Sequence, residues 1–213
     1  MKRTMSLLRK CEYEEISKLK IDGTILDLGG DKRSGYHELI RGEHKIEVVN
    51  LNRECGPDYE FDLEEIFPLK NESYDCVLCL NVLEHVFNFQ NIVNESFRIL
   101  KPGGRLIGAV PFLFNVHGSP NDYFRYTKSA LVRVTTDAGF KDIEIKELGF
   151  GLFSVIYQLK FGLYRPNFIK YVAMNLGVFL DKIILHKFLK IIRPNHHLTQ
   201  EYLPLGYFFE VKK

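Results

Sequence analysis

The sequence predicts an α/β fold, with a mostly parallel sheet that carries helices on both faces. Strand-like and helix-like patterns alternate from residue 24 to about residue 148, as in βαβ units. The first strand-like run, residues 24–28, leads directly into Gly29-Gly30. A glycine turn after a first parallel strand lets the backbone approach a ligand closely, and α/β folds bind nucleotide-like ligands there.

Seven strands are expected. They are short apolar or β-branched runs, most of them bounded by turn residues. The expected strands are residues 24–28, 46–51, 59–61, 74–80, 105–110, 143–148 and 206–211.

Helices are expected between these strands. Residues 34–41 are a short helix candidate. Apolar residues recur with helical spacing over 89–100, and Lys101-Pro102-Gly103-Gly104 ends that helix. Thr127 is a plausible N-cap of another helix, which ends at Ala138-Gly139-Phe140.

Residues 151–200 interrupt the alternation before the last strand, so we expect a single domain, 1–213, with a helical insertion. The insertion carries seven Lys or Arg against one acidic residue, Asp181, so its formal charge is +6 and the remainder is −4. Its charges break every window of ~20 apolar residues, which argues against a membrane span. Two interpretations stay open: helices that lie on a membrane surface, or helices that cover the domain or form a homodimer interface.

Charge and cysteine content exclude several classes of function. The net charge of +2 gives no case for nucleic-acid binding. Cys76 and Cys79 form a C-x-x-C without a second pair, so we expect core thiols rather than a zinc site. His196 and His197 have no partner cluster, and no metal is expected. Residues 1–10 lack the long apolar region of a secretory signal, so a cytoplasmic location is expected.

Four stretches resemble the motifs of class I S-adenosylmethionine-dependent methyltransferases, in that family's order. This family shares a Rossmann-like, seven-stranded fold. The stretches are Ile25-Leu26-Asp27-Leu28-Gly29-Gly30, the run from Asp62 to Pro68, the run from Tyr74 to Val86, and the run from Arg98 to Leu106. Residues 111–113, 117–127 and 203–209 further resemble a subgroup associated with bacterial polysaccharide and cell-envelope biosynthesis.

The resemblance implies S-adenosylmethionine as cofactor. It assigns cofactor contacts to Asp27, Gly29, Gly30, Asn50, Asp62, Leu63, Asn81 and Leu83. Asp62 would bind the adenine amino group, while Asn81 and Leu83 would line the methionine side. The residues alone allow plainer roles too, with Asp27 capping its turn and Asp62 capping a short helix at 63–66.

The sequence departs from the family pattern in two places. The later glycines of the turn are altered or shifted, because it reads Gly29-Gly30-Asp31-Lys32-Arg33-Ser34-Gly35. The acidic residue that usually grips the ribose hydroxyls is Asn50, whose carbonyl can accept only an uncharged hydrogen bond. A member that binds cofactor or docks on a membrane without catalysis is therefore a second hypothesis.

The acceptor site is expected beyond the strands at 74–80 and 105–110. His117 is the preferred general base, since imidazole takes a hydroxyl proton near neutral pH. Substrate contacts are expected from His85, Asp122, Tyr123 and Arg125. The alternatives are that His117 only packs or binds, that His85 orients a loop, and that the aromatic residues pack the loop on the sheet.

These observations favour an O-methyltransferase that acts on a small molecule, a glycan or a lipid-linked envelope precursor. The protein would be cytoplasmic or peripheral at the inner face of the cell membrane. A nicotinamide dehydrogenase fits less well, because no Tyr-x-x-x-Lys pair surrounds Tyr123 or Tyr126 and because residues 100–104 fit the methyltransferase order.

Overall fold

The computed structural model describes residues 5–118, 120–161, 167–189, 191 and 199–213, so His196 and His197 lie outside the described residues. The chain forms two compact units. One comprises Tyr13–Val110, His117–Lys146 and Phe208–Lys213, and is called the sheet unit here. The other comprises Met1–Glu12, Pro111–Val116 and Glu147–Tyr207, and is called the helical unit.

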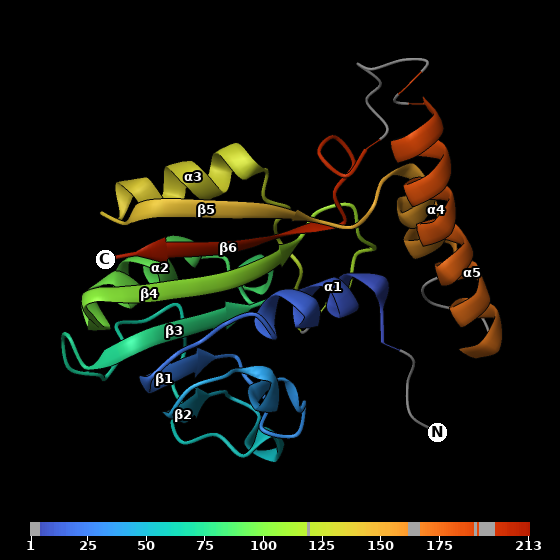
Figure 1. Cartoon of the computed structure of the whole chain (residues 1–213). Coiled ribbons are helices and arrows are strands. Elements are labelled where there is room, and N and C mark those ends of the chain that lie inside the picture. Colours follow the sequence, from blue (N-terminus) through green and yellow to red (C-terminus); the bar gives the residue numbers. More distant parts are fainter. Residues whose placement is uncertain (1–4, 119, 162–166, 190, 192–198) are drawn as a thin grey trace. The chain divides into compact units, whose positions relative to one another are not determined.

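The described residues form a six-stranded sheet in the order β2-β1-β3-β4-β6-β5 (Figure 1). β1 pairs in parallel with β2 and β3, and β3 pairs in parallel with β4. β6 runs opposite to its neighbours, as Figure 1 shows. The strands are β1 Gly23–Leu28, β2 His44–Val49, β3 Tyr74–Leu80, β4 Leu100–Pro111, β5 Lys141–Leu148 and β6 Gly206–Lys212.

The seventh expected strand, residues 59–61, is reduced to a single parallel bridge between Val49 and Tyr59. The Asp58 carboxylate accepts a hydrogen bond from the Val48 amide at 2.8 Å. The Asn52 amide, which would donate to residue 61 in a longer strand, instead donates to Asn50 Oδ1 at 2.9 Å, so a side chain takes the place of that strand partner. The sheet consequently has six strands where seven were expected.

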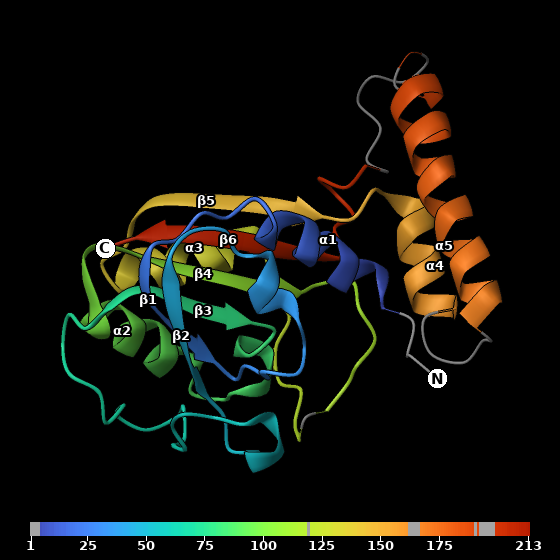
Figure 2. The same ribbon diagram turned by 60° about the horizontal axis from the view of Figure 1, so that its bottom comes forward.

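The helices at 89–100 and after Thr127 are confirmed. α2 spans Phe89–Ile99 and α3 spans Lys128–Asp137, and the Thr127 side chain accepts a bond from the Ala130 amide at 3.2 Å. Residues 34–41 form only the 3₁₀ turn η1, Tyr36–Leu39. Two more 3₁₀ turns follow later strands, η2 at Arg53–Cys55 and η3 at Leu83–His85. α1, Leu7–Ile16, was not expected from the sequence, although Ser6 caps it by accepting from the Arg9 amide at 3.2 Å (Figure 2).

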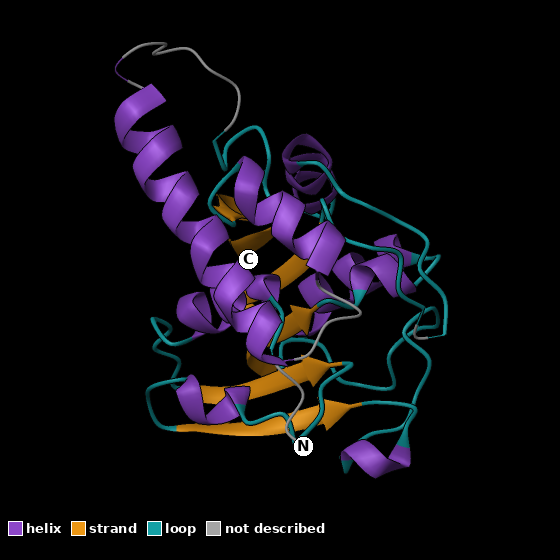
Figure 3. Ribbon diagram, turned by 90° about the vertical axis from the view of Figure 1, so that its right-hand side faces the viewer, coloured by secondary structure: helices purple, strands orange, loops and turns teal. Residues whose placement is uncertain are grey.

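The helical unit contains α4 Leu152–Phe161, α5 Asn167–Leu180 and the π-helix η4 Asp181–Leu189. No helix among the described residues is long and apolar enough to span a membrane. Figure 3 shows these helices in purple and the strands of the sheet in orange.

The central strands carry the core. Ile25 and Leu26 on β1, Val77 on β3 and Ile107 on β4 are completely buried. Cys76 and Cys79 are also buried free thiols, and their burial raises the pKa of both. They pack as small apolar side chains, which confirms the expectation drawn from their apolar run.

Gly108 on β4 leaves room for the Phe209 ring of β6. A Cβ added at Gly108 would lie 2.2 Å from the ring carbon Cζ of Phe209. We therefore expect Gly108→Ala to lower the free energy of unfolding by about 1–3 kcal/mol, as overpacking does. Urea denaturation would measure it. The same alanine should cost less in a Phe209→Leu background, and an equal cost in both backgrounds would contradict the contact.

Candidate functional site

A pocket of about 580 Å³ opens in the sheet unit where the strands end. Gly29 follows β1, Asn50 follows β2 and Asn81 follows β3, and all three line it. The carboxyl ends of parallel strands are the usual ligand site of such sheets, and the volume suits a small molecule. The other lining residues are Val49, Leu51, Asn52, Phe61, Asp62, Leu63, Glu64, Val82, His85, Val86, Pro120, Asn121 and Tyr123.

Asp27 is a buried carboxylate at the end of β1. The Tyr36 hydroxyl donates to its Oδ2, and His37 Nε2 lies 2.6 Å from the same oxygen. Its Oδ1 is buried without a hydrogen-bond partner among the described residues. A Cβ at Gly30 would lie 2.1 Å from Oδ2, so only glycine fits against this carboxylate. The structure therefore ties Asp27 to η1 and to the glycine turn.

The turn after β1 is held by two glycines and two ion pairs. Gly29 has a φ of 69° and Gly35 a φ of 75°, in the left-handed region that favours glycine. Between them, Asp31 pairs with Arg33 at 2.9 Å, and Lys32 pairs with Asp58 at 2.8 Å. The turn is thus closed by side chains at positions where the family pattern has glycines.

Asn50 braces this turn from the end of β2. Its Nδ2 donates to the carbonyl oxygens of Gly29, at 3.2 Å, and Gly30, at 2.8 Å. Its Oδ1 accepts from the Asn52 amide at 2.9 Å. A carboxylate could not donate either of the first two bonds. The amide is therefore suited to holding the glycine turn, a role that the sequence did not indicate.

Three further cofactor candidates, Asp62, Leu63 and Asn81, lie in the pocket wall. Asp62 Oδ1 accepts from the Glu64 amide at 2.9 Å, so the expected capping bond forms, although in a turn rather than a helix. Leu63 is the next residue, and its carbonyl accepts from Asn91 Nδ2 at 2.9 Å. Asn81 has a φ of 55°, a conformation that Asn tolerates better than most residues. Such strained positions cluster at functional sites.

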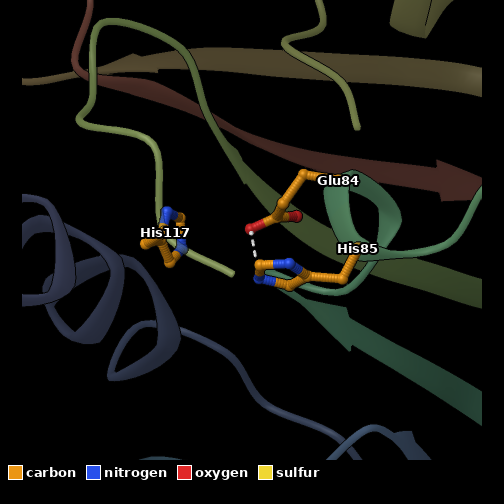
Figure 4. Close-up of side chains that lie close together, drawn as sticks. All are labelled: Glu84, His85 and His117. Carbon is orange, nitrogen blue, oxygen red and sulfur yellow. Dashed lines mark ion pairs between the residues drawn. The ribbon is translucent and has the colours of Figure 1, made fainter. Parts of the chain in front are cut away.

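Glu84, His85 and His117 gather beside the pocket (Figure 4). The His85 and His117 rings stand edge to face, 5.0 Å apart, and His85 Nε2 lies 3.6 Å from a carboxylate oxygen of the buried Glu84. His85 Nδ1 lies 2.5 Å from the Asn121 carbonyl oxygen. That carbonyl selects the tautomer with the proton on Nδ1.

The loop that carries His117 is fastened to η3. The amide of Tyr123 donates to the Glu84 carbonyl at 2.7 Å, and the Tyr126 hydroxyl donates to the Leu83 carbonyl at 3.0 Å. Burial raises the pKa of Tyr126. Tyr123 is 44% exposed and lines the pocket, whereas Phe124 joins an aromatic cluster with Phe87, Phe89 and Tyr126. The packing alternative thus describes Phe124 and Tyr126, whereas Tyr123 both packs on Phe87, with ring centroids 5.4 Å apart, and lines the pocket.

Asp122 and Arg125 form an ion pair within this loop. Arg125 donates to both carboxylate oxygens of Asp122, through Nη1 to Oδ1 and through Nη2 to Oδ2 at 2.7 Å. The Arg125 guanidinium lowers the pKa of Asp122 to about 2. The same carboxylate accepts from the His117 amide at 2.8 Å and lies 3.5 Å from His117 Nδ1. The pair therefore orders the loop around His117, which the expectation of substrate contacts did not include.

The site fits the implied cofactor. Asp27 leaves a buried acceptor oxygen two residues before the pocket, and a positively charged amino group would satisfy it. The pocket mixes apolar walls with amide and carboxylate side chains. Glu84, His85 and His117 also offer ligand atoms that all lie within 4.8 Å of one another, so a divalent cation could bind there, where no metal was expected from the sequence.

Comparisons with known proteins agree with this geometry. A family profile described as "Methyltransferase domain" matches residues 40–108. In fold, the chain is similar to a SAM-dependent methyltransferase from Archaeoglobus fulgidus, with a TM-score of 0.59, 16% identity, and 94% of this chain and 90% of that chain covered. Residues 40–108 thus match a methyltransferase domain, and the chain has the fold of S-adenosylmethionine-dependent methyltransferases.

Two curated relatives of this methyltransferase domain match about half of the chain. An uncharacterized protein of Methanocaldococcus jannaschii is 54% identical over 124 residues, which are 52% of this chain and 53% of the relative. The ubiquinone biosynthesis O-methyltransferase of Pseudomonas savastanoi pv. phaseolicola is 31% identical over 121 residues, 51% of this chain and 48% of the relative. The chain thus spans about half the length of these relatives.

The structure adds residues that the sequence analysis of the methyltransferase domain did not single out. Tyr36 and His37 hold Asp27, and Val82 touches Gly29, where an added Cβ would lie 2.7 Å from Cγ2 of Val82. Asn121 holds His85 through a backbone carbonyl, which no side-chain pattern reveals. Only the position of Tyr36 and His37 shortly after the glycine turn could have pointed to them.

Asn50 allows a test of its role as a brace. Asn50→Asp removes both donor bonds to the glycine turn and places a carboxylate oxygen near two carbonyl oxygens. We expect the affinity for S-adenosylmethionine, measured by calorimetry, to fall about tenfold, in line with the net worth of lost hydrogen bonds. Asn94→Asp, at an exposed position of α2 outside the pocket lining, is the matched control. Tighter binding by Asn50→Asp would instead show that the ribose grip of the family pattern dominates.

Asp122 gives the fold a pH dependence. Because its pKa is lowered from an ordinary 3.8 to about 2, the Asp122 ion pair stabilises the folded protein fully above about pH 4. This contribution is lost as the pH falls toward 2. We expect Asp122→Asn to lower the free energy of unfolding by about 2 kcal/mol at neutral pH. In urea denaturation, the difference from the wild type should shrink below pH 4, and a constant difference would contradict this assignment.

Proposed function

We propose that this protein is an S-adenosylmethionine-dependent O-methyltransferase whose acceptor hydroxyl belongs to a glycan or a lipid-linked precursor. The observation that carries this proposal is the position of the His85–His117 pair beside the pocket at the strand ends. The pocket would hold the cofactor, and the histidines stand where an acceptor can reach it.

The cofactor supplies an activated methyl group, so the protein has to position the acceptor and remove its proton. We assign cofactor binding to Gly29, Asp62, Leu63 and Asn81, which line the pocket. Asp27 would contribute through the turn that it holds, and Leu83 is buried in η3 behind the pocket wall.

His117 is the proposed general base. Its Nδ1 faces the Asp122 carboxylate, which favours the tautomer with the proton on Nδ1 and the lone pair on Nε2. Nε2 would accept the hydroxyl proton of the acceptor as its oxygen attacks the methyl carbon. Asp122 and Arg125 act as positioning residues in this scheme, while His85 and Tyr123 would contact the acceptor from the pocket wall.

The choice of an oxygen acceptor rests on two supports. The curated Pseudomonas relative is named an O-methyltransferase, and a histidine base suits a hydroxyl. The glycan or lipid-linked class rests on the resemblance of residues 111–113, 117–127 and 203–209 to methyltransferases of envelope biosynthesis. A phenolic acceptor is the competitor, and both classes belong in one assay.

The test begins with cofactor binding. We expect calorimetry to show micromolar binding of S-adenosylmethionine and S-adenosylhomocysteine, which Asp62→Ala weakens and the adjacent exposed control Glu65→Ala does not. No binding at millimolar ligand would overturn the methyltransferase proposal and favour a scaffold without catalysis.

Turnover is then measured as methyl transfer to a panel of lipid-linked saccharides, free glycans and phenols. We expect His117→Gln to lower kcat by about 10²- to 10⁴-fold while the cofactor Kd stays unchanged. His44→Gln, at the opposite end of β2, is the matched control. If a chelator abolishes activity, and if His117→Gln and His85→Gln are equally defective, the two histidines would be metal ligands, and His117 would not be the general base.

A further inference from the structure

We propose that the helical unit binds the surface of an anionic lipid bilayer through the exposed face of α5 and η4. This inference is separate from the proposed chemistry, because it concerns the helical unit alone. It rests on a rigid helical hairpin, on a continuous exposed apolar stripe, and on the sign of the surrounding charges.

The hairpin is built around the buried Asp181, at the junction of α5 and η4. Its carboxylate accepts from the backbone amides of Phe153, at 2.9 Å, and Ser154, at 2.8 Å, and from the Ser154 hydroxyl. These amides lie in the first turn of α4, where a carboxylate satisfies unpaired N–H groups. Gly177 lets the helices approach, because a Cβ there would lie 3.2 Å from the Phe153 carbonyl oxygen. The side of α5 that carries Gly177 is thus packed against α4.

The opposite face is apolar and exposed. A stripe of large apolar side chains recurs at i, i+4, i+8, i+11 and i+15, which places them on one side of the helix. Their exposed fractions range from 42% to 77%. The stripe consists of Phe168, Val172, Leu176, Phe179 and Ile183. Ile169, Tyr171 and Ile184 widen it, and an apolar patch of this extent marks a contact surface.

The charges around the stripe identify the partner. Among the described residues of α4, α5 and η4, the Lys and Arg side chains are Lys160, Lys170, Lys182 and Lys187. The one acidic side chain in these helices is Asp181, which is buried and used inside the hairpin. Lys160, Lys182 and Lys187 are exposed and Lys170 is half-buried, so the accessible charges of these helices are all positive.

An anionic bilayer offers both complements that this surface needs, acyl chains for the stripe and phosphate headgroups for the lysines. A second copy would bring the same positive charges face to face, which disfavours a homodimer through this face. Aromatic side chains such as Phe168, Tyr171 and Phe179 suit the interface between headgroups and acyl chains. With no spanning helix among the described residues, the arrangement indicates helices that lie on the bilayer.

Vesicle sedimentation tests the proposal with the full chain. Phosphatidylcholine vesicles that contain about 30% phosphatidylglycerol provide the anionic surface, and pure phosphatidylcholine vesicles the neutral one. We expect the protein to sediment with the anionic vesicles, and about tenfold less with the neutral ones or in about 1 M salt. Protein that stays in the supernatant with anionic vesicles at low salt would overturn the proposal.

Matched variants separate the two components. Leu176→Ser/Phe179→Ser should lose binding, whereas Ile66→Ser/Val132→Ser, exposed apolar positions of the sheet unit, should keep it. Lys170→Glu/Lys187→Glu should lose binding to anionic vesicles, and Lys70→Glu/Lys141→Glu should not. Circular dichroism verifies that each variant is folded. Retained binding by a folded Leu176→Ser/Phe179→Ser variant would overturn the assignment. It would also be overturned if the wild-type protein does not bind vesicles but forms a dimer in analytical ultracentrifugation, and if this variant is a monomer.

Discussion

The buried carboxylate of Asp27 is the constraint on which the site depends. A charge at the end of a central strand is costly unless neighbouring groups satisfy it. Tyr36 and His37 meet this need from η1, and the contact with Gly30 leaves no room for a side chain there. The strand end, the turn and the 3₁₀ helix are therefore fixed together. Gly29, two residues later, lines the pocket, so the contacts of Asp27 fix the position of this part of the pocket wall.

The pocket wall formed by η3 and the loop at 117–127 depends on hydrogen bonds to backbone carbonyls between segments distant in sequence. η3 follows β3, and its carbonyl groups accept from Tyr123 and Tyr126, about 40 residues further along the chain. These bonds bring His117 close to His85, although the imidazole rings of the two histidines take no part in them. The Asp122–Arg125 pair then orders the same loop. The proposed acceptor side is thus a loop held against a rigid strand end, an arrangement in which sequence can vary while the sheet is retained.

The sequence predicted the parts of this molecule that follow from local pattern. Strand runs such as 74–80, the N-cap at Thr127 and the core thiols of Cys76 and Cys79 all depend on neighbouring residues, and the structure has them. The strand at 59–61 is reduced to one bridge because the Asn50 side chain accepts from the Asn52 amide, which a longer strand would have paired with residue 61. Such competition between a side chain and a strand partner cannot be read from periodicity.

In the candidate site, too, some residues could be assigned from the sequence, whereas some contacts could not. The resemblance to the family's motifs assigned Asn50, Asp62 and Asn81 to the cofactor, and all three line the pocket. The partners of Asp122 were not predicted, because an Asp-x-x-Arg spacing fits both an internal ion pair and two substrate contacts. The burial of Asp122, with 3% of its side chain exposed, decides for the ion pair. Long-range burial is information that a single sequence does not carry.

The two departures from the family pattern carry a different meaning in the structure than in the sequence. Read as motifs, a shifted glycine and an amide in place of an acid suggest a weakened cofactor site. In the folded chain, Asp31 pairs with Arg33 within the turn at 2.9 Å, and the Asn50 amide donates to two carbonyls of that turn. Each altered position makes a contact that the usual residue could not make, since glycine has no side chain and a carboxylate has no donor. The changes are coupled to one another through the turn, since Asn50 donates to the two glycine carbonyls with which that turn begins.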